Sequence, residues 1–244
     1  SNDHNVPNRC LRLAAERLGV KTVYMQHASV SELFPPLEFD YALLDGRVAL
    51  DTYSRCSDMQ DSKILHNVKQ CQVFLSGQKK RVTALGQTEN SSQMVGLAVN
   101  SLDDYAHVEQ LAKNLVERDY LCIVRTHPFQ APAFLQKLHD YIEFNPMVKW
   151  SNSREEGVSD FFAKVSCVIA GNTSIHLEAA LAGLETFYYE MSDKVHLPDY
   201  YGYVKNGVSM SLEPGFTLAE LQSAIEKVNS QERNQAIKNY SETY

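Results

Sequence analysis

The stretch Cys167-Val-Ile-Ala-Gly-Asn-Thr-Ser-Ile-His-Leu-Glu178 decides the fold that we expect for this chain. An apolar run of four residues is followed by a glycine, three small polar residues and an alanine-rich segment with the spacing of a helix. This pattern is typical of a buried strand that turns directly into a helix. The sequence therefore predicts a strand over residues 167–170 and a helix over residues 174–182.

The same alternation of strand-like and helix-like segments extends along most of the chain. Further strands are predicted over residues 22–25, 39–44, 72–75, 94–99, 120–125, 148–150 and 185–189. Further helices are predicted over residues 9–18, 47–56, 133–142, 158–164, 218–228 and 232–240, and after the capping segment 101–104. Alternating strands and helices favour an α/β fold with a Rossmann-type parallel sheet. The polar segment 57–67 predicts a linker, which gives expected domains over residues 1–68 and 69–244.

Composition excludes several classes of protein. The 244 residues include 23 Lys and Arg against 30 Asp and Glu, a formal charge of −7, and 44% are hydrophobic, which suits a water-soluble globular protein. No apolar run reaches the roughly 18 to 20 residues of a membrane span. No block of cations predicts a nucleic-acid groove. Five scattered cysteines without a Cys-x-x-Cys pair are typical of a reducing compartment, so we expect a cytoplasmic protein.

Polar groups gather where three of the predicted strands end, which is where open α/β sheets bind ligands. These groups are His27, His127 and the turn 171–174. Backbone N–H groups and hydroxyls at the start of a helix can form a cradle for an anion. The alternative is that Thr173 or Ser174 only caps its helix.

Glu178 lies four residues after Ser174 and therefore on the same face of the predicted helix. A carboxylate there could accept hydrogen bonds from the two hydroxyls of a ribose while the turn binds phosphate. Alternatively, Glu178 is a solvated charge on the helix surface.

The two histidines at strand ends suggest different chemistry. Pro128 biases His127 toward an extended conformation, from which its ring could donate to a phosphate oxygen, although a His-Pro pair is often only a turn. His27 could act as a general base, because the pKa of imidazole lies near neutral pH. The alternative for His27 is a buried, hydrogen-bonded histidine.

Several known motifs are missing from the sequence. There is no Asp-x-Asp, His-x-x-x-His or Cys-x-x-Cys spacing, so we expect no metal site. The glycine signatures of dinucleotide-binding, P-loop and α/β-hydrolase proteins are also missing, and we expect no cofactor.

Three segments together resemble the GT-B glycosyltransferases: Tyr24-Met-Gln-His27, Arg125-Thr-His-Pro128 and Gly171-Asn-Thr-Ser-Ile-His-Leu-Glu178. The resemblance is strongest to bacterial surface-polysaccharide enzymes, namely sialyl- and polysialyltransferases, Kdo transferases and CDP-glycerol glycerophosphotransferases. It implies a metal-independent, inverting transfer from a CMP-, CDP- or UDP-linked donor to a capsule, lipopolysaccharide or cell-wall glycan. It also implies that His27 is the base and that Glu178 holds the donor ribose. The residues implied to bind the rest of the donor nucleotide are Arg125, His127, Pro128, Gly171, Asn172, Thr173 and Ser174, with Lys194 as a further cation.

The sequence departs from the family in two respects. Ala28 replaces the usual glycine, and only the last one or two strand–helix units of the N-terminal domain are recognisable. We therefore expect a nucleotide-binding half with an abbreviated acceptor-side half, whose last helix, 232–240, returns to the first domain. The family implies a location at the inner face of the bacterial cytoplasmic membrane, reached through segments outside this sequence. Two alternatives stay open: a sugar-nucleotide 2-epimerase, and a module that binds a nucleotide or glycan without catalysis.

Overall fold

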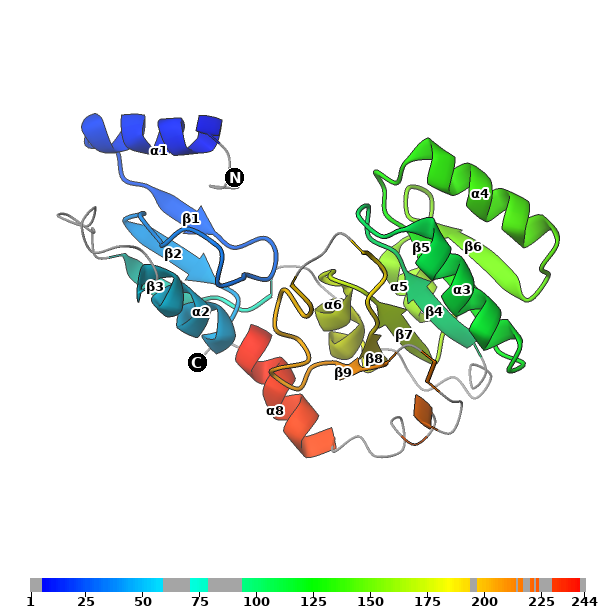
Figure 1. The fold of residues 1–244 in the computed structure, drawn as a ribbon. Coiled ribbons are helices and arrows are strands. Elements are labelled where there is room, and N and C mark those ends of the chain that lie inside the picture. The colour runs from blue at the N-terminus through cyan, green and yellow to red at the C-terminus, as the bar shows by residue number, and fades with distance from the viewer. Residues whose placement is uncertain are drawn as a thin grey trace. The chain divides into compact units, whose positions relative to one another are not determined.

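The computed structural model describes residues 6–58, 71–78, 94–193, 197–213, 215–216, 220–221, 223 and 230–241 (Figure 1). It divides into two compact units, one formed by Ser1–Arg81 with Asn234–Tyr244 and the other by Val82–Arg233. Both units contain a sheet whose strands are all parallel, so the expected α/β class is confirmed. Among the described helices, none has the length and apolar character needed to cross a membrane.

The first unit is built around a three-stranded sheet in the order β1-β2-β3. Its elements are α1 (Val6–Arg17), β1 (Val23–Met25), β2 (Tyr41–Leu44), α2 (Arg47–Asp58), β3 (Gln72–Leu75) and most of α8 (Ser230–Ser241). The core lies between the sheet and α2, where Tyr24 and Leu44 pack with Tyr53 and Cys56.

The division between the units differs from the boundary expected after residue 68. β3 pairs with β2 in the first sheet, and its Val73 and Leu75 pack against the first core. The segment expected as a linker lies mostly outside the described residues. The expected return of the last helix is confirmed, because a Cβ atom on Gly46 would come within 2.5 Å of the backbone carbon of Tyr240.

The second unit has a six-stranded sheet in the order β6-β5-β4-β7-β8-β9. Its elements are β4 (Met94–Ala98), α3 (Tyr105–Val116), β5 (Leu121–Thr126), α4 (Pro132–Glu143), β6 (Val148–Asn152), α5 (Val158–Phe162), β7 (Cys167–Ala170), α6 (Ile175–Leu181), β8 (Glu185–Tyr188) and β9 (Met210–Ser211). The two-residue strand β9 was not predicted, since it is too short to show a periodic pattern. The helix predicted over 218–228 lies largely outside the described residues.

Helices cover both faces of this sheet. On one face, α3 and α4 contribute Leu111 and Leu138 to a core, and on the other face α5 and α6 contribute Phe161 and Ala179 to a second core. Strands buried on both faces read as continuous apolar runs, which is why the sequence revealed them clearly.

The strand order places the end of β4 between the ends of β5 and β7. The chain first adds strands on one side of β4 and later on the other side. In open parallel sheets, the loops on either side of such a reversal diverge and leave a crevice for a ligand. The loops that follow β4, β5 and β7 therefore surround the candidate site.

Candidate functional site

The loops that follow β4 and β7 are joined at the reversal of strand order. The side-chain amide of Asn100 donates to the carbonyl oxygen of Asn172 over 2.7 Å. A Cβ atom on Gly171 would lie 3.4 Å from Oδ1 of Asp103 and 3.5 Å from the carbonyl oxygen of Tyr189. Gly171 therefore lies beside both neighbouring segments, at a distance where a Cβ atom would make ordinary van der Waals contact with them.

Asn172 holds the turn in place. Its side-chain nitrogen donates to the hydroxyl of Tyr188 over 3.1 Å, and its Oδ1 accepts from the backbone N–H of Tyr200 over 2.7 Å. These bonds tie the turn to β8 and to the segment that follows it. The amide of Asn172, expected to face the donor, is thus engaged with the protein and positions the turn.

Thr173 and Ser174 end the turn just before α6, and Glu178 lies one helical turn further on, within α6. The hydroxyl of Thr173 accepts from the backbone N–H of Ile175 over 3.5 Å, a long contact in keeping with the capping alternative. Ser174 donates through its hydroxyl to Oε1 of Glu178 over 3.3 Å. Glu178 is only 7% exposed, so it is not a solvated surface charge. The expectation that Ser174 and Glu178 share one helix face is confirmed.

His176 supports the turn from inside the protein, a role that the sequence analysis missed. The ring is fully buried, and Nε2 lies 2.9 Å from the carbonyl oxygen of Gly171. Burial lowers the pKa of His176 to about 4, so the ring is neutral at pH 7 and donates through Nε2 to that carbonyl. Nδ1 lies 3.3 Å from the hydroxyl of Ser209. A histidine between Ile175 and Leu177 on a helix gave no signal of this contact in the sequence.

His127 presents one ring nitrogen to the site. Its Nδ1 accepts from the backbone N–H of Phe129 over 3.2 Å, so the neutral ring carries its proton on Nε2. Burial lowers the pKa of His127, which favours the neutral form. The carbonyl of Pro128 accepts from Nε of Arg154 over 2.6 Å, which fixes the loop. His127 therefore offers a single N–H donor at the end of β5.

Arg125 does not have the surroundings that the resemblance implies. Its guanidinium is buried, donates to the hydroxyl of Ser151 over 2.9 Å and to the carbonyl of Glu156 over 3.0 Å, and lies 4.0 Å from the Glu156 carboxylate. Burial lowers the pKa of Arg125, whereas the charges of Glu156, Glu178 and Asp160 act in the opposite direction. Its planar group is thus engaged with protein partners.

Asp103 is a second residue that the sequence analysis missed. Its side chain is 8% exposed, and Oδ2 accepts from the backbone N–H of Asn100 over 2.7 Å. Burial raises the pKa of Asp103 to about 7, and the charge of Glu190 acts in the same direction. The sequence could not reveal this, because Glu190 and Gly171 approach Asp103 only in the folded chain.

His27 lies in the first unit, at the end of β1. Its side chain is exposed, which contradicts the alternative of a buried structural histidine. The preceding residue, Gln26, is buried and ties this segment to the start of α2, accepting from the backbone N–H of Asp45 over 2.9 Å and donating to the carbonyl of Ala28 over 3.0 Å.

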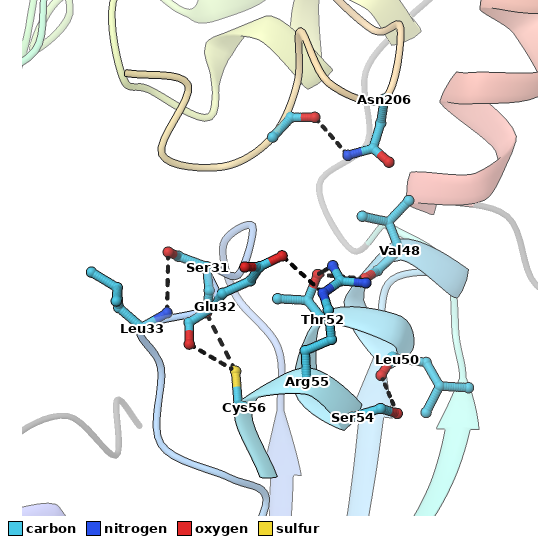
Figure 2. Close-up of polar contacts among 11 residues, drawn as sticks. Ser31, Glu32, Leu33, Val48, Leu50, Thr52, Ser54, Arg55, Cys56 and Asn206 are labelled. Carbon is cyan, nitrogen blue, oxygen red and sulfur yellow. Dashed lines mark hydrogen bonds and ion pairs between the residues drawn. The ribbon is translucent and has the colours of Figure 1, made fainter. Parts of the chain in front are cut away.

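The segment that follows His27 is held against α2, as Figure 2 shows. Arg55 donates to the carboxylate of Glu32 over 2.8 Å. The thiol of Cys56 lies 3.4 Å from the carbonyl oxygen of Glu32 and is buried. Burial raises the pKa of Cys56, so this thiol is protonated at neutral pH, as expected of a core cysteine.

One group of side chains in the described part of the chain has the composition of a metal site. Oxygen or nitrogen atoms of Asp104, His107 and Asp193 lie within 4.8 Å of one another. His107 and Asp193 are 86 residues apart, so no local spacing could indicate the group. Lys194, the further cation expected near the phosphate, lies outside the described residues.

Comparison with solved structures shows which fold this is. A co-structure of S. aureus MnaA with UDP matches with a TM-score of 0.56 at 14% identity, covering 95% of this chain and 65% of that chain. A UDP-GlcNAc 2-epimerase from Methanocaldococcus jannaschii, in complex with UDP-GlcNAc and UDP, matches with a TM-score of 0.54 at 14% identity, covering 91% of this chain and 66% of that one. A GtfA/B complex matches with a TM-score of 0.53 at 9% identity, covering 96% of this chain and 52% of that one.

These matches establish the expected GT-B-like α/β fold. The chain spans between about half and two thirds of the length of these structures. Neither a protein-family model nor a curated protein matches the sequence.

Proposed function

We propose that the second unit binds a nucleotide-activated sugar where β4, β5 and β7 end, and that the protein is a metal-independent glycosyltransferase. The proposal rests on the strand order, in which His127 follows β5 and Ser174 and Glu178 follow β7, on either side of β4 at one edge of the sheet. His127 supplies a neutral N–H donor, and Glu178 supplies a buried carboxylate. A ligand that carries both a phosphate, to accept from His127, and a diol, to donate to Glu178, matches these two groups.

The spacing of the strands supports a phosphate between His127 and the turn after β7. Both groups follow strands of one sheet, with β4 between them, and neighbouring strands lie about 4.8 Å apart. The backbones of the two segments are thus separated by about 10 Å, which side chains from either side can bridge to a diphosphate. A hydrogen bond from His127 to such a charged group would contribute about 1.5 to 3 kcal/mol.

Glu178 would accept from the ribose hydroxyls, and Ser174 would keep the carboxylate oriented through the bond that it already makes. The hydroxyls of Thr173 and Ser174 would contact the phosphate. Asn172 and Gly171 would shape the turn, and Arg125 would stabilise the end of β5. His27, exposed at the end of β1, would take the proton from the acceptor hydroxyl, and the acceptor would be a bacterial surface glycan.

A sugar-nucleotide 2-epimerase is the second candidate. The solved structures that match include one described as a UDP-GlcNAc 2-epimerase with UDP-GlcNAc and UDP bound. An epimerase acts on the nucleotide sugar alone, whereas a transferase needs an acceptor. Incubation of the protein with UDP-GlcNAc in the absence of any acceptor, followed by analysis of the sugar, separates the two reactions.

Titration calorimetry with CMP, CDP, UDP and GDP tests the nucleotide site directly. We expect at least one nucleotide to bind, and His127→Ala to weaken that binding by about ten- to a hundredfold through loss of the charge-assisted hydrogen bond. His139→Ala is the matched control, because His139 is exposed on α4 and packs on Trp150. Equal affinity of the wild type and His127→Ala would remove His127 from the site, and a lack of binding by all four nucleotides would refute the proposal.

A further inference from the structure

A pocket of about 280 Å³ opens between the N-terminal ends of α3 and α4. It lies in the second unit and is lined by both the loop after β4 and the loop after β5. Its lining includes Asp103, Tyr105, Gln130, Phe134 and Lys137. Neither the turn after β7 nor Glu178 lines it, so this pocket is separate from the groups assigned to the nucleotide.

Gln130 is the unusual residue of the pocket. Its side chain is 5% exposed, and its Oε1 is buried without a hydrogen-bond partner among the described residues. Its backbone N–H donates to the carbonyl of His127 over 3.0 Å, which fixes the main chain at this point. A buried acceptor without a partner is rare in folded proteins, because its lost hydration costs free energy. Oε1 itself has no exposed surface, but Gln130 lines the pocket, so a rotation of its side chain toward the pocket would let an outside donor remove that cost.

The other side chains that line the pocket indicate which kind of ligand could supply a donor to Gln130. Asp103 adds a buried carboxyl group. One of its oxygens, Oδ2, already accepts a hydrogen bond from the backbone N–H of Asn100. Tyr105 and Phe134 form an edge-to-face pair with ring centres 5.3 Å apart, which gives the pocket an aromatic wall. The ammonium of Lys137 lies 5.7 Å from the centre of the Tyr105 ring, so the aromatic wall carries a positive charge.

This combination selects among small ligands. The charged groups of the lining have both signs, Lys137 beside Asp103 and Asp104, so they favour neither a free cation nor an anion. A neutral molecule with several hydroxyls can donate to the oxygens of Gln130 and Asp103 and place its C–H groups on the aromatic wall. The volume is just below the range of about 300 to 1,000 Å³ that is usual for small-molecule sites, which limits the occupant to about one sugar ring.

We propose that this pocket binds one monosaccharide unit, with one hydroxyl donating to Oε1 of Gln130 and another to the carboxyl group of Asp103. The proposal stands on the pocket and on Gln130, and does not depend on nucleotide binding. The unit could belong to a free sugar or to a residue of a longer glycan, since both present the same hydroxyls.

Ligand-observed saturation-transfer NMR tests the proposal, with glucose, galactose and N-acetylglucosamine as probes. We expect saturation transfer to at least one of these sugars, and a loss of affinity of about tenfold or more in Gln130→Leu, which removes the acceptor at similar side-chain volume. Gln136→Leu is the matched control, because Gln136 is exposed on α4 and does not line the pocket. A disaccharide built from the sugar that binds distinguishes a glycan from a free sugar as the natural ligand. Tighter binding of the disaccharide than of the monosaccharide indicates a glycan, and equal or weaker binding indicates a free sugar.

Asp103→Asn provides a second variant if Gln130→Leu does not fold, and we expect it to weaken the same sugar. Calorimetry with the nucleotide that the wild type binds is expected to give the same affinity in Gln130→Leu, so a failure at one site is distinguishable from a failure at the other. The proposal is overturned if none of the three sugars shows saturation transfer. It is also overturned if the transfer persists unchanged in both folded variants.

Discussion

Two loops at the same edge of the second sheet differ in how completely their polar groups are used. In the turn after β7, Asn172 bonds to two neighbouring segments and His176 lies within hydrogen-bond distance of both Gly171 and Ser209. In the loop after β5, Oε1 of Gln130 is buried without a partner in the described part of the chain, and the ring of Phe129 is 81% exposed. Hydrogen bonds hold both loops, but the loop after β5 keeps a buried side-chain acceptor without a partner among the described residues.

The difference has a physical meaning for binding. A turn whose bonds are already made keeps its shape when a ligand arrives, so no ordering cost is added on binding. A loop that carries unpaired donors and acceptors gains hydrogen bonds only when a ligand supplies the partners. We infer that the bonds of Asn172 and His176 hold the turn after β7 as a scaffold for the groups proposed to bind there, whereas in the loop after β5 Gln130 keeps an acceptor that a ligand can use. The following experiments test this contrast, in order of decreasing expected effect.

The two histidines next to these loops give the largest expected contrast. His176→Ala removes a fully buried ring and leaves the carbonyl of Gly171 without its donor, so we expect a loss of about 4 to 5 kcal/mol in unfolding free energy. His127→Ala is the control and is expected to cost less than about 1 kcal/mol, because its ring is partly exposed. Urea denaturation measures both values. Similar losses in the two variants would remove the distinction between the two loops.

The carboxyl group of Asp103 makes stability depend on pH. Burial raises its pKa from 3.8 to about 7, so between these values the folded protein holds a proton that the unfolded chain releases. Stability contributed by this group is therefore present at acidic pH and is lost as pH rises toward 7, by about 4 kcal/mol in total.

Comparison with Asp103→Asn isolates this effect, because the amide does not titrate. We expect the difference in unfolding free energy between variant and wild type to grow between about pH 4 and pH 7 and to stay constant above it. Asp140→Asn, at an exposed position on α4, is expected to show no comparable growth. A flat difference for Asp103→Asn across this range would show that Asp103 is not held in its protonated form.

Asn172→Ala tests whether the scaffold depends on its central amide. The variant loses the bonds to Tyr188 and Tyr200, and we expect a loss of about 2 to 3 kcal/mol. Asn206→Ala removes an exposed amide that donates to the carbonyl of Gly202, and it is expected to cost less than about 1 kcal/mol. Thermal unfolding followed by circular dichroism measures both. An effect of Asn172→Ala as small as that of the control would show that the turn keeps its shape without this side chain.

Much of the architecture was predictable because the strands of the second sheet are apolar on both faces. The run 167–170 and the helix after it appear in the structure as β7 and α6, and Ser174 lies next to Glu178 as their spacing predicts. The short strand β9 and the membership of β3 in the first sheet were not predictable in the same way. Both depend on pairing with a distant strand and not on the local pattern.

The candidate site was only partly predictable for a related reason. His127 stood out because a strand end and a proline mark it in the sequence. Asp103 and His176 gave no such signal, since their importance comes from burial and from groups far along the chain. Gln130, which lines the separate pocket, gave none because its burial arises only in the folded chain. For Arg125 the sequence could not show that Ser151 and Glu156 already accept hydrogen bonds from its guanidinium, because these partners lie 26 and 31 residues further along the chain.

Gln130→Leu gives the smallest expected effect on stability, and it has the opposite sign. Leucine removes a buried oxygen that has no partner among the described residues and adds apolar contact with the pocket wall, so we expect a gain of about 1 kcal/mol in unfolding free energy. Gln136→Leu, at an exposed position on α4, is expected to change stability by less than about 0.5 kcal/mol. Urea denaturation compares the two variants with the wild type. A clear loss of stability in Gln130→Leu would mean that Oε1 has a stabilising partner in the free protein, and the loop after β5 would then be as completely bonded as the turn after β7.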